Sequence, residues 1–212
     1  MGFPYFNIHS HFRDKQNAAI FQASSIQEDC WFSFGIHPWD SDSNSDFGVF
    51  HETLKHQNCL AVGEIGLDKL SGVNLDSQIQ IFTRQIELSE EFQLPVIIHC
   101  VRAWNELKLL KRSLNPTQSW IYHGFSKNNI LDEVLAEGMF VSFGQRIMND
   151  QDLLKSTLDV PMNKIFFETD NKQVEIEQIF SAFANAKQIT LQELKKIQFE
   201  NFKRVFKKWK NG

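Results

Sequence analysis

The sequence has little cysteine, no long apolar run and no excess of positive charge. Because no run of 18 apolar residues occurs, we expect no membrane span, and no early stretch has the pattern of a signal peptide. The net charge of −4 argues against a dedicated polyanion-binding protein but leaves a transient nucleic-acid substrate open. The three cysteines are odd in number and far apart, as expected for reduced thiols in the cytoplasm: Cys30, Cys59 and Cys100.

The chain has 212 residues, enough to bury a substantial core, and 42% of them are hydrophobic. This composition excludes a largely disordered protein. No linker, low-complexity tract or internal repeat divides the sequence. We therefore expect one cytoplasmic domain over residues 1–212, with no obligate protein partner.

Short apolar runs alternate with amphipathic segments along most of the chain. The segments 75–93, 103–113, 127–137 and 150–159 have helical spacing of apolar residues. Such alternation indicates an α/β protein with a parallel sheet buried on both faces. Seven or eight strands suggest a TIM-type (β/α) barrel, and an open doubly wound sheet is the competing arrangement. The pattern alone does not decide between them. The runs are "GFPYFNIH", "AAIFQASS", "CWFSFGIHPWD", "CLAVGEIGLD", "LPVIIHC", "SWIYHGFS", "MFVSFGQ" and "KIFFETD".

The two ends of the chain carry further signals. Only about eight residues separate His9 from Ala18, too few for an ordinary crossover helix. Either the first helix is missing or "AAIFQA" is not a barrel strand. Near the C-terminus, Thr190 is expected to cap a final helix that docks on the barrel through five apolar residues: Leu194, Ile197, Phe202, Val205 and Phe206.

Five histidines and two carboxylates stand at or just after the ends of the apolar runs. In parallel α/β folds the C-terminal ends of the strands converge on one face, where active sites lie. Imidazole and carboxylate groups are the ligands of divalent transition metals such as zinc, manganese and nickel. The pattern therefore predicts a metal site built from strand ends. Its candidate residues are His9, His11, His37, Glu64, His99, His123 and Asp170.

Six ordered motifs, "NIHSHF", "GIHPWD", "GEIGLD", "VIIHC", "YHGFS" and "ETD", resemble the signatures of the TatD-like metal-dependent deoxyribonucleases of the amidohydrolase superfamily. The resemblance covers nearly the whole chain. It implies a TIM barrel, whose first βα unit is compressed according to the spacing of His9 and Ala18, and a hydrolase that uses two divalent metal ions to cleave phosphodiester bonds.

The resemblance also implies a ligand set. His9 and His11 would bind the first ion together with Asp170, and His99 and His123 would hold the second. Glu64 would bridge both ions, since a shared carboxylate offsets the repulsion of two dications about 3.5–4 Å apart. Asp170 would also orient the attacking water and accept its proton. Zinc, manganese, magnesium and nickel all remain candidates for the metal.

The remaining candidates have weaker signals. His37 is expected either to touch the substrate or to fix its loop. Asp68 is expected mainly to stabilise its loop, with orientation of a ligand histidine as the alternative. Trp39 and Trp104 either form a platform for base stacking or pack against the barrel rim.

Departures from the family pattern fall in the substrate-binding loops. Asn7 replaces a common aspartate, and the arginine expected two residues after the ligand His99 is shifted to Arg102. Lys127 stands where the family has glycine and can restore a positive charge. The motif "ETDNK" lacks the usual proline. We expect His37, Arg102 and Lys127 to be the substrate-binding residues.

Two other functions remain open from the sequence. Related barrels hydrolyse C–N or ester bonds, including D-aminoacyl esters of transfer RNA. Many amidohydrolases use a carbamylated lysine as the metal bridge, whereas Glu64 is the bridge candidate here, and this favours TatD chemistry. The last alternative is a catalytically silent metal-binding scaffold, which has no chemical need for all six ligands.

Overall fold

The structure, a computed structural model, describes residues 2–14, 16–41 and 47–209. The chain divides into two compact units. The first unit comprises residues 1–21 and 123–205, and the second comprises residues 22–122 and 206–212. The expectation of one domain over residues 1–212 stays a prediction.

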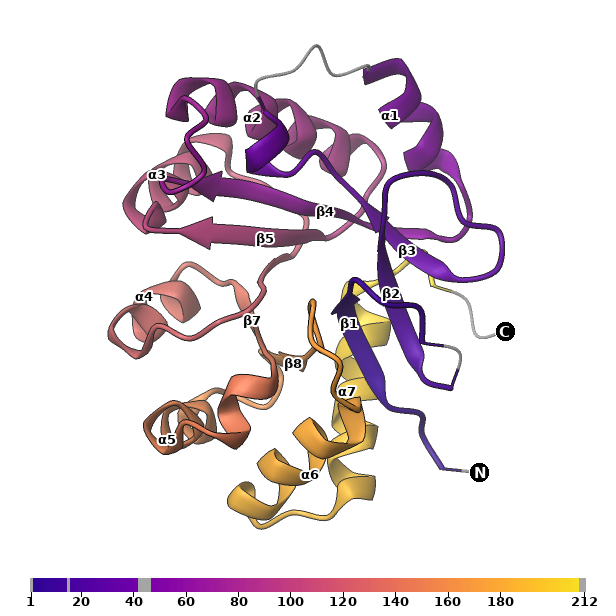
Figure 1. The fold of residues 1–212 in the computed structure, drawn as a ribbon, viewed down its shortest axis with the longest axis vertical. Helices are drawn as coiled ribbons and strands as arrows, with labels where there is room; N and C mark the ends of the chain where they lie inside the picture. Colours follow the sequence, from indigo (N-terminus) through magenta and orange to yellow (C-terminus); the bar gives the residue numbers. More distant parts are fainter. Residues whose placement is uncertain (1, 15, 42–46, 210–212) are drawn as a thin grey trace. The chain divides into compact units, whose positions relative to one another are not determined.

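Every apolar run predicted to be a strand forms one (Figure 1). Within each unit the strands pair in parallel, β1 with β2 and β7 with β8 in the first unit, and β3 through β6 in sequence order in the second. The strands of the described residues are β1 (Phe6–Ser10), β2 (Ala18–Ala23), β3 (Trp31–Phe34), β4 (Cys59–Asp68), β5 (Val96–Val101), β6 (Trp120–Tyr122), β7 (Phe140–Phe143) and β8 (Ile165–Phe167).

The predicted helices also form, and two further helices, α1 and α6, lie outside the predicted set. The buried residues of α6 are isoleucine, phenylalanine and alanine. Isoleucine and phenylalanine have a higher propensity for strands than for helices, so we attribute the helix to the burial of one face rather than to local propensity. No helix in the described ranges is long and apolar enough to cross a membrane. The helices are α1 (Phe47–Lys55), α2 (Leu75–Glu91), α3 (Trp104–Leu114), α4 (Leu131–Ala136), α5 (Gln151–Asp159), α6 (Ile176–Lys187) and α7 (Leu191–Val205), with 3₁₀ turns η1 (Pro38–Asp40), η2 (Asn128–Ile130) and η3 (Gln145–Met148).

The connection from β1 to β2 decides the question about the first βα unit. The amide of Ala18 donates to the carbonyl of Tyr5 at 3.0 Å, and Phe6 pairs with Ala18 in the parallel ladder. The described residues of the connection, 11–14 and 16–17, contain no helix. The segment "AAIFQA" is thus a strand, and the first crossover helix is absent.

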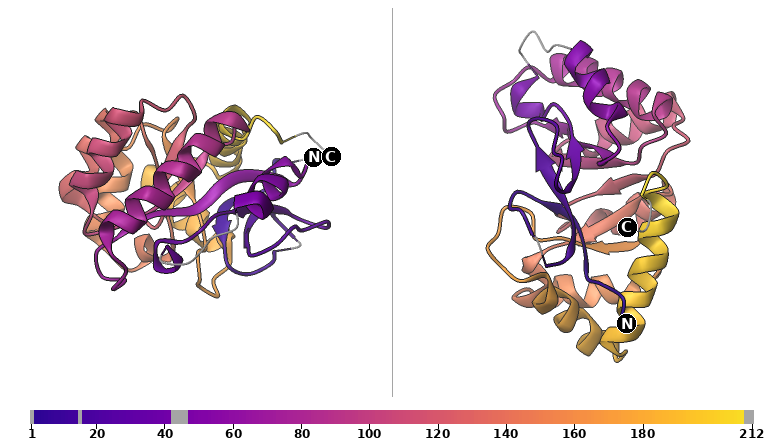
Figure 2. Two further views of the ribbon diagram at one scale, coloured as in Figure 1. Left: turned by 90° about the horizontal axis from the view of Figure 1, so that it is seen from above. Right: turned by 90° about the vertical axis from the view of Figure 1, so that its right-hand side faces the viewer.

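In the first unit, α7 packs along β1 and β8 (Figure 2). Thr190 caps its start, as predicted, since its hydroxyl accepts from the Glu193 amide at 3.2 Å. The Glu193 carboxylate in turn accepts from the Thr190 amide at 2.8 Å, which makes the cap reciprocal. Four of the five predicted docking residues are buried and one, Ile197, is half-buried. The ring of Phe202 lies 4.4 Å from that of Phe6.

In the second unit, α2 packs on β4 and places two buried glutamines beside the strand ends. The Gln78 side chain accepts from the amide of Asp68 at 2.7 Å and donates to its carbonyl at 3.0 Å. Gln85 makes the same pair of bonds with Ile36, at 2.7 and 3.1 Å. These amide side chains replace missing backbone partners and so fix the chain immediately before His37 and at the end of β4.

Candidate metal-binding sites

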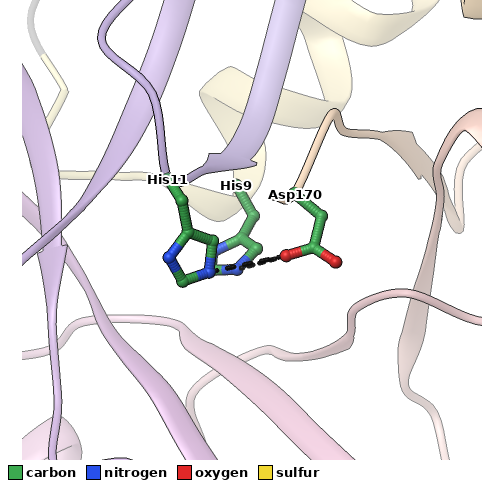
Figure 3. Close-up of side chains that lie close together, drawn as sticks. All are labelled: His9, His11 and Asp170. Atoms are coloured by element: carbon green, nitrogen blue, oxygen red, sulfur yellow. Dashed lines mark ion pairs between the residues drawn. The ribbon is translucent and has the colours of Figure 1, made fainter. Parts of the chain in front are cut away.

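The side chains of His9, His11 and Asp170 lie close together in the first unit (Figure 3), and backbone hydrogen bonds join the segments that carry them. The Asp170 amide donates to the His9 carbonyl at 3.0 Å, and the His11 amide donates to the Asp170 carbonyl at 2.9 Å. His9 lies in β1 and His11 directly follows it, and both imidazoles lie near the Asp170 carboxylate. The left-handed backbone of Asp170, with φ of 53°, follows the end of β8.

The three side chains form a compact donor set. Asp170 Oδ1 lies 3.6 Å from His9 Nε2 and 3.5 Å from His11 Nε2. One ligand atom from each residue lies within 4.8 Å of the others, which suits a single metal ion. His9 is fully buried, whereas the His11 and Asp170 side chains are 40% and 31% exposed. The donor set is therefore buried at His9 and open to water or substrate at His11 and Asp170.

His123 lies beside this set and is held by a buried carboxylate. Its ring centroid is 4.5 Å from that of His9, and its Nδ1 is 3.2 Å from Oε1 of Glu168. The same oxygen accepts from the amide of Gly124 at 2.6 Å. Burial of Glu168 raises its pKa, but its interactions with His123, His9 and Ser142 together outweigh burial and lower the pKa below its usual value. With Nδ1–H directed at Glu168, the lone pair of His123 is left on Nε2.

Asn7, where the family commonly has aspartate, joins β1 to the segment that carries Asp170. Its side chain donates to the Thr169 hydroxyl at 2.8 Å and accepts from the Thr169 amide at 3.1 Å. The Thr169 hydroxyl in turn donates to Ser10 Oγ at 3.1 Å. Asn7 therefore has a structural role beneath the donor set, and its amide supplies a hydrogen that an ionised aspartate lacks.

In the second unit, the His99 ring lies between the carboxylates of Glu64 and Asp68. His99 Nδ1 lies 2.6 Å from Glu64 Oε1, and its Nε2 lies 3.1 Å from Asp68 Oδ2. A neutral imidazole that donates Nε2–H to Asp68 presents a lone pair to the Glu64 carboxylate. Two acceptors at this distance repel each other unless they share a cation, either a proton or a metal ion. The chemistry of this donor pair thus fits a divalent metal.

Asp68 orients His99 and also fixes its own loop, so both roles considered for it are present. Its carboxylate accepts from the indole of Trp39 at 2.7 Å and from the Leu70 amide at 2.8 Å. Burial alone raises the Asp68 pKa, but these bonds and the one from His99 lower it below its usual value. The residue stays ionised and holds the His99 ring.

His37 joins Glu64 and His99 in a three-residue cluster. Its Nε2 lies 3.4 Å from Glu64 Oε1, and its Nδ1 accepts from the Trp39 amide at 3.3 Å. A neutral ring whose Nδ1 lone pair accepts a hydrogen bond carries its own hydrogen on Nε2. His37 is therefore built to donate to Glu64 and to fix its loop, while the lone pair of His99 is the one directed at the carboxylate.

The predicted substrate residues have mixed surroundings. Arg102 follows β5 with φ of 54° and is exposed, without an ion pair in the described chain. Lys127 is half-buried at the start of η2. Trp104 is 7% exposed, which excludes it as a stacking platform, whereas Trp39 is 60% exposed.

A pocket of about 290 Å³ adjoins Asp170 in the first unit. This volume is near the lower end for small-molecule sites. Glu168 and Asp170 line it on one side, and Arg146 and Lys172 supply positive charge. Lys127 is not among its described lining residues, although the adjacent Ser126 is.

Sequence reasoning missed Glu168. The residue opens the "ETD" motif, two positions before Asp170, and only the aspartate has a predicted role there. The available signal was a carboxylate directly after the apolar run "KIFF", where an unpaired charge is costly. Such a carboxylate needs a partner from elsewhere in the fold, and that partner is His123.

Comparison with known proteins confirms the resemblance. The profile of the family "TatD related DNase" matches residues 6–207. A Bacillus subtilis relative named uncharacterized metal-dependent hydrolase YabD is 26% identical, over 82% of this chain and 76% of that protein. A relative from Pectobacterium atrosepticum, named 3'-5' ssDNA/RNA exonuclease TatD, is also 26% identical, over 74% of this chain but only 63% of its own length.

Solved structures show the same fold. The TatD homologue YJJV from Escherichia coli superposes with a TM-score of 0.80 at 17% identity, covering 96% of this chain and 98% of the other. A TatD-family hydrolase from Entamoeba histolytica gives 0.77 at 16% identity, with 97% and 99% coverage. The fold class is the predicted TIM-type barrel rather than an open doubly wound sheet. The chain belongs to the TatD-related DNase family of metal-dependent hydrolases.

Proposed function

We propose that this protein hydrolyses phosphodiester bonds in single-stranded nucleic acid with the help of divalent metal ions. The observation that carries the proposal is the juxtaposition of His9, His11 and Asp170, whose ligand atoms lie within 4.8 Å of one another around an open side. The name of the Pectobacterium relative, a 3'-5' ssDNA/RNA exonuclease, supports the choice of substrate.

The proposed ligands follow from the lone pairs. His9, His11 and Asp170 hold one ion. His99 and His123 are ligands of a second, because a ring nitrogen that donates to Asp68 or to Glu168 leaves the lone pair of the neutral imidazole on the other nitrogen. Glu64 is kept as the bridging ligand that the sequence predicts. Zinc, manganese, magnesium and nickel all suit such nitrogen and oxygen donors.

Bound divalent ions supply Lewis acidity and bring the pKa of water near neutrality. The chain supplies orientation and proton transfer. Asp170 is the proposed proton acceptor, since its carboxylate is partly exposed and lies between two histidines. Nε2 of His37 lies 3.4 Å from the same Glu64 oxygen that faces His99. His9, Glu64 and Glu168 are buried, so water does not reach the donor sets from the side of the protein core.

The substrate strand needs positive charge outside the metal ligands. Arg146 and Lys172 line the pocket beside Asp170, and we propose that they contact phosphate there. His37, Arg102 and Lys127 are kept as the further substrate contacts that the sequence predicts. The three free cysteines support a cytoplasmic location.

The test compares wild type with Asp170→Asn and with Asp132→Asn, an exposed control of the same charge change. Wild type should hydrolyse bis-p-nitrophenyl phosphate and, more slowly, short single-stranded DNA when manganese, magnesium, zinc or nickel is added. Asp170→Asn should lower both rates together by about 10²–10⁴-fold, as expected for loss of a general base. The control should keep wild-type rates.

Two outcomes would replace the proposal. If wild type ignores every phosphodiester but cleaves an amide, a lactone or an aminoacyl ester, the C–N or ester hydrolase alternative is correct. If it binds metal and cleaves none of these substrates, the silent scaffold is correct.

A further inference from the structure

Two residues of the second unit that carry exposed, large apolar side chains are hydrogen-bonded to the same carboxylate, that of Asp68. Trp39 is 60% exposed and Leu70 is 61% exposed. Both are tied to Asp68, whose carboxylate accepts from the Trp39 indole at 2.7 Å and from the Leu70 amide at 2.8 Å. Asp68 Oδ2 also lies 3.1 Å from His99. We call this pair the Trp39–Leu70 ledge.

The Trp39 ring is held in place although it is exposed. Its indole N–H meets a carboxylate that is only 3% exposed, so the ring does not rotate freely. Its edge contacts His37, with ring centroids 5.1 Å apart and planes at 89°. Because η1 begins at Pro38, the backbone that carries Trp39 is restricted as well. The aromatic surface is thus oriented by contacts within the chain, which lowers the entropic cost of binding a ligand to it.

We propose that the Trp39–Leu70 ledge stacks a nucleobase of the single strand, next to the phosphodiester bond that is cleaved. This inference rests on the proposed function and adds a substrate-binding residue to it. An exposed, oriented indole favours a flat aromatic ligand, and stacking tolerates any base because every base has a π-face. Two side chains are far too few for a stable protein interface, which needs about 800 Å² from each partner.

The position of the ledge follows from Asp68. Asp68 Oδ2 accepts from the Trp39 indole and lies 3.1 Å from Nε2 of His99. The Trp39 ring and a proposed metal ligand thus contact the same oxygen atom. A base on the ledge would therefore belong to a nucleotide adjoining the reacting phosphate. Since Trp39 contacts the base and not the phosphate, it is a binding residue and does not take part in the chemistry.

The test measures binding rather than cleavage. Fluorescein-labelled, phosphorothioate-linked strands resist hydrolysis, and one carries eight thymines while the other carries eight abasic sites. Fluorescence anisotropy with the metal-loaded protein gives both affinities. Wild type should bind the thymine strand more tightly than the abasic strand. Trp39→Ala should weaken binding of the thymine strand by about tenfold, the loss of one stacked base, and change binding of the abasic strand less than twofold.

Three variants separate the ring from its hydrogen bond. Trp39→Phe keeps an aromatic face and loses the bond to Asp68, so it should keep most of the preference for thymine. Trp39→Leu fills the space without a π-face and should resemble Trp39→Ala, which guards against a folding defect in the smaller variant. Leu109→Ala, in α3 of the same unit and 64% exposed, should change nothing.

The inference is overturned if wild type binds both strands equally, or if Trp39→Phe loses as much as Trp39→Ala. The second result would mean that the bond to Asp68 matters and the ring does not. Failure of the proposed function looks different, because a protein that cleaves no phosphodiester bond can still be scored for its preference between the two strands.

Discussion

The carboxylate of Glu168, fully buried, lies 3.2 Å from Nδ1 of His123 and accepts the amide of Gly124 with the same oxygen. This bond sets the tautomer of His123 and directs its other nitrogen away from the carboxylate. Asp68 does the same for His99 in the second unit. Each proposed histidine ligand of the second ion is therefore hydrogen-bonded to a buried carboxylate, which raises its basicity as a metal ligand.

Replacing Glu168 by Gln should weaken metal binding by about 10–100-fold, because the amide lacks the charge that supports His123. Competition with a chromogenic chelator measures the affinity. Glu200→Gln, on the exposed side of α7, is the matched control. An unchanged affinity in Glu168→Gln would show that Glu168 only stabilises the fold.

Wild type should hold up to two divalent ions per chain, measured by elemental analysis of protein made in metal-supplemented medium. Glu64→Gln should lower both occupancies, because the lost negative charge is predicted to bridge two cations. His123→Ala should lower mainly one. Glu52→Gln, which is exposed, serves as control. Wild type with less than about a tenth of an equivalent of any divalent metal would contradict the two-metal assignment.

Gly66→Ala should destabilise the fold by about 3 kcal/mol, the upper end for an overpacked site. A Cβ at this position would lie 1.8 Å from the carbonyl oxygen of His99, where β4 and β5 approach each other. Gly72 also has a positive φ, but a Cβ added there would have no atom within 4 Å. Gly72→Ala should therefore lower the free energy of unfolding by about 1 kcal/mol, from backbone strain alone. Urea denaturation measures both changes, and equal losses would rule out the close approach.

The cysteines should differ in reactivity in the native protein. Cys30 is partly exposed, whereas Cys59 and Cys100 are buried. Burial raises the pKa of Cys59 to about 12, so its thiolate is scarce until the pH approaches that value. At pH 8 a thiol reagent should modify about one group per chain, and three in denaturant without reductant. Only one reactive thiol in denaturant would reveal a disulfide and contradict the cytoplasmic assignment.

Much of the fold is determined locally along the sequence. The run "CLAVGEIGLD" becomes β4 over its full length, since its residues are buried on both faces as in parallel sheets. The reciprocal bonds of Thr190 and Glu193 lie within four residues and were predictable at the capping position. The short connection between β1 and β2 left two interpretations, and only the ladder from Phe6 to Ala18 decided between them.

The residue types of the candidate metal centre were determined by the sequence alone, because histidines and carboxylates that recur at successive strand ends supply the nitrogen and oxygen donors of a divalent metal. Their partners were decided only by the tertiary structure. Glu168 and His123 are 45 residues apart, and His99 and Asp68 are 31 apart. No local periodicity links such pairs. A buried carboxylate must find a donor to compensate for lost water, and only the folded chain determines which histidine supplies it.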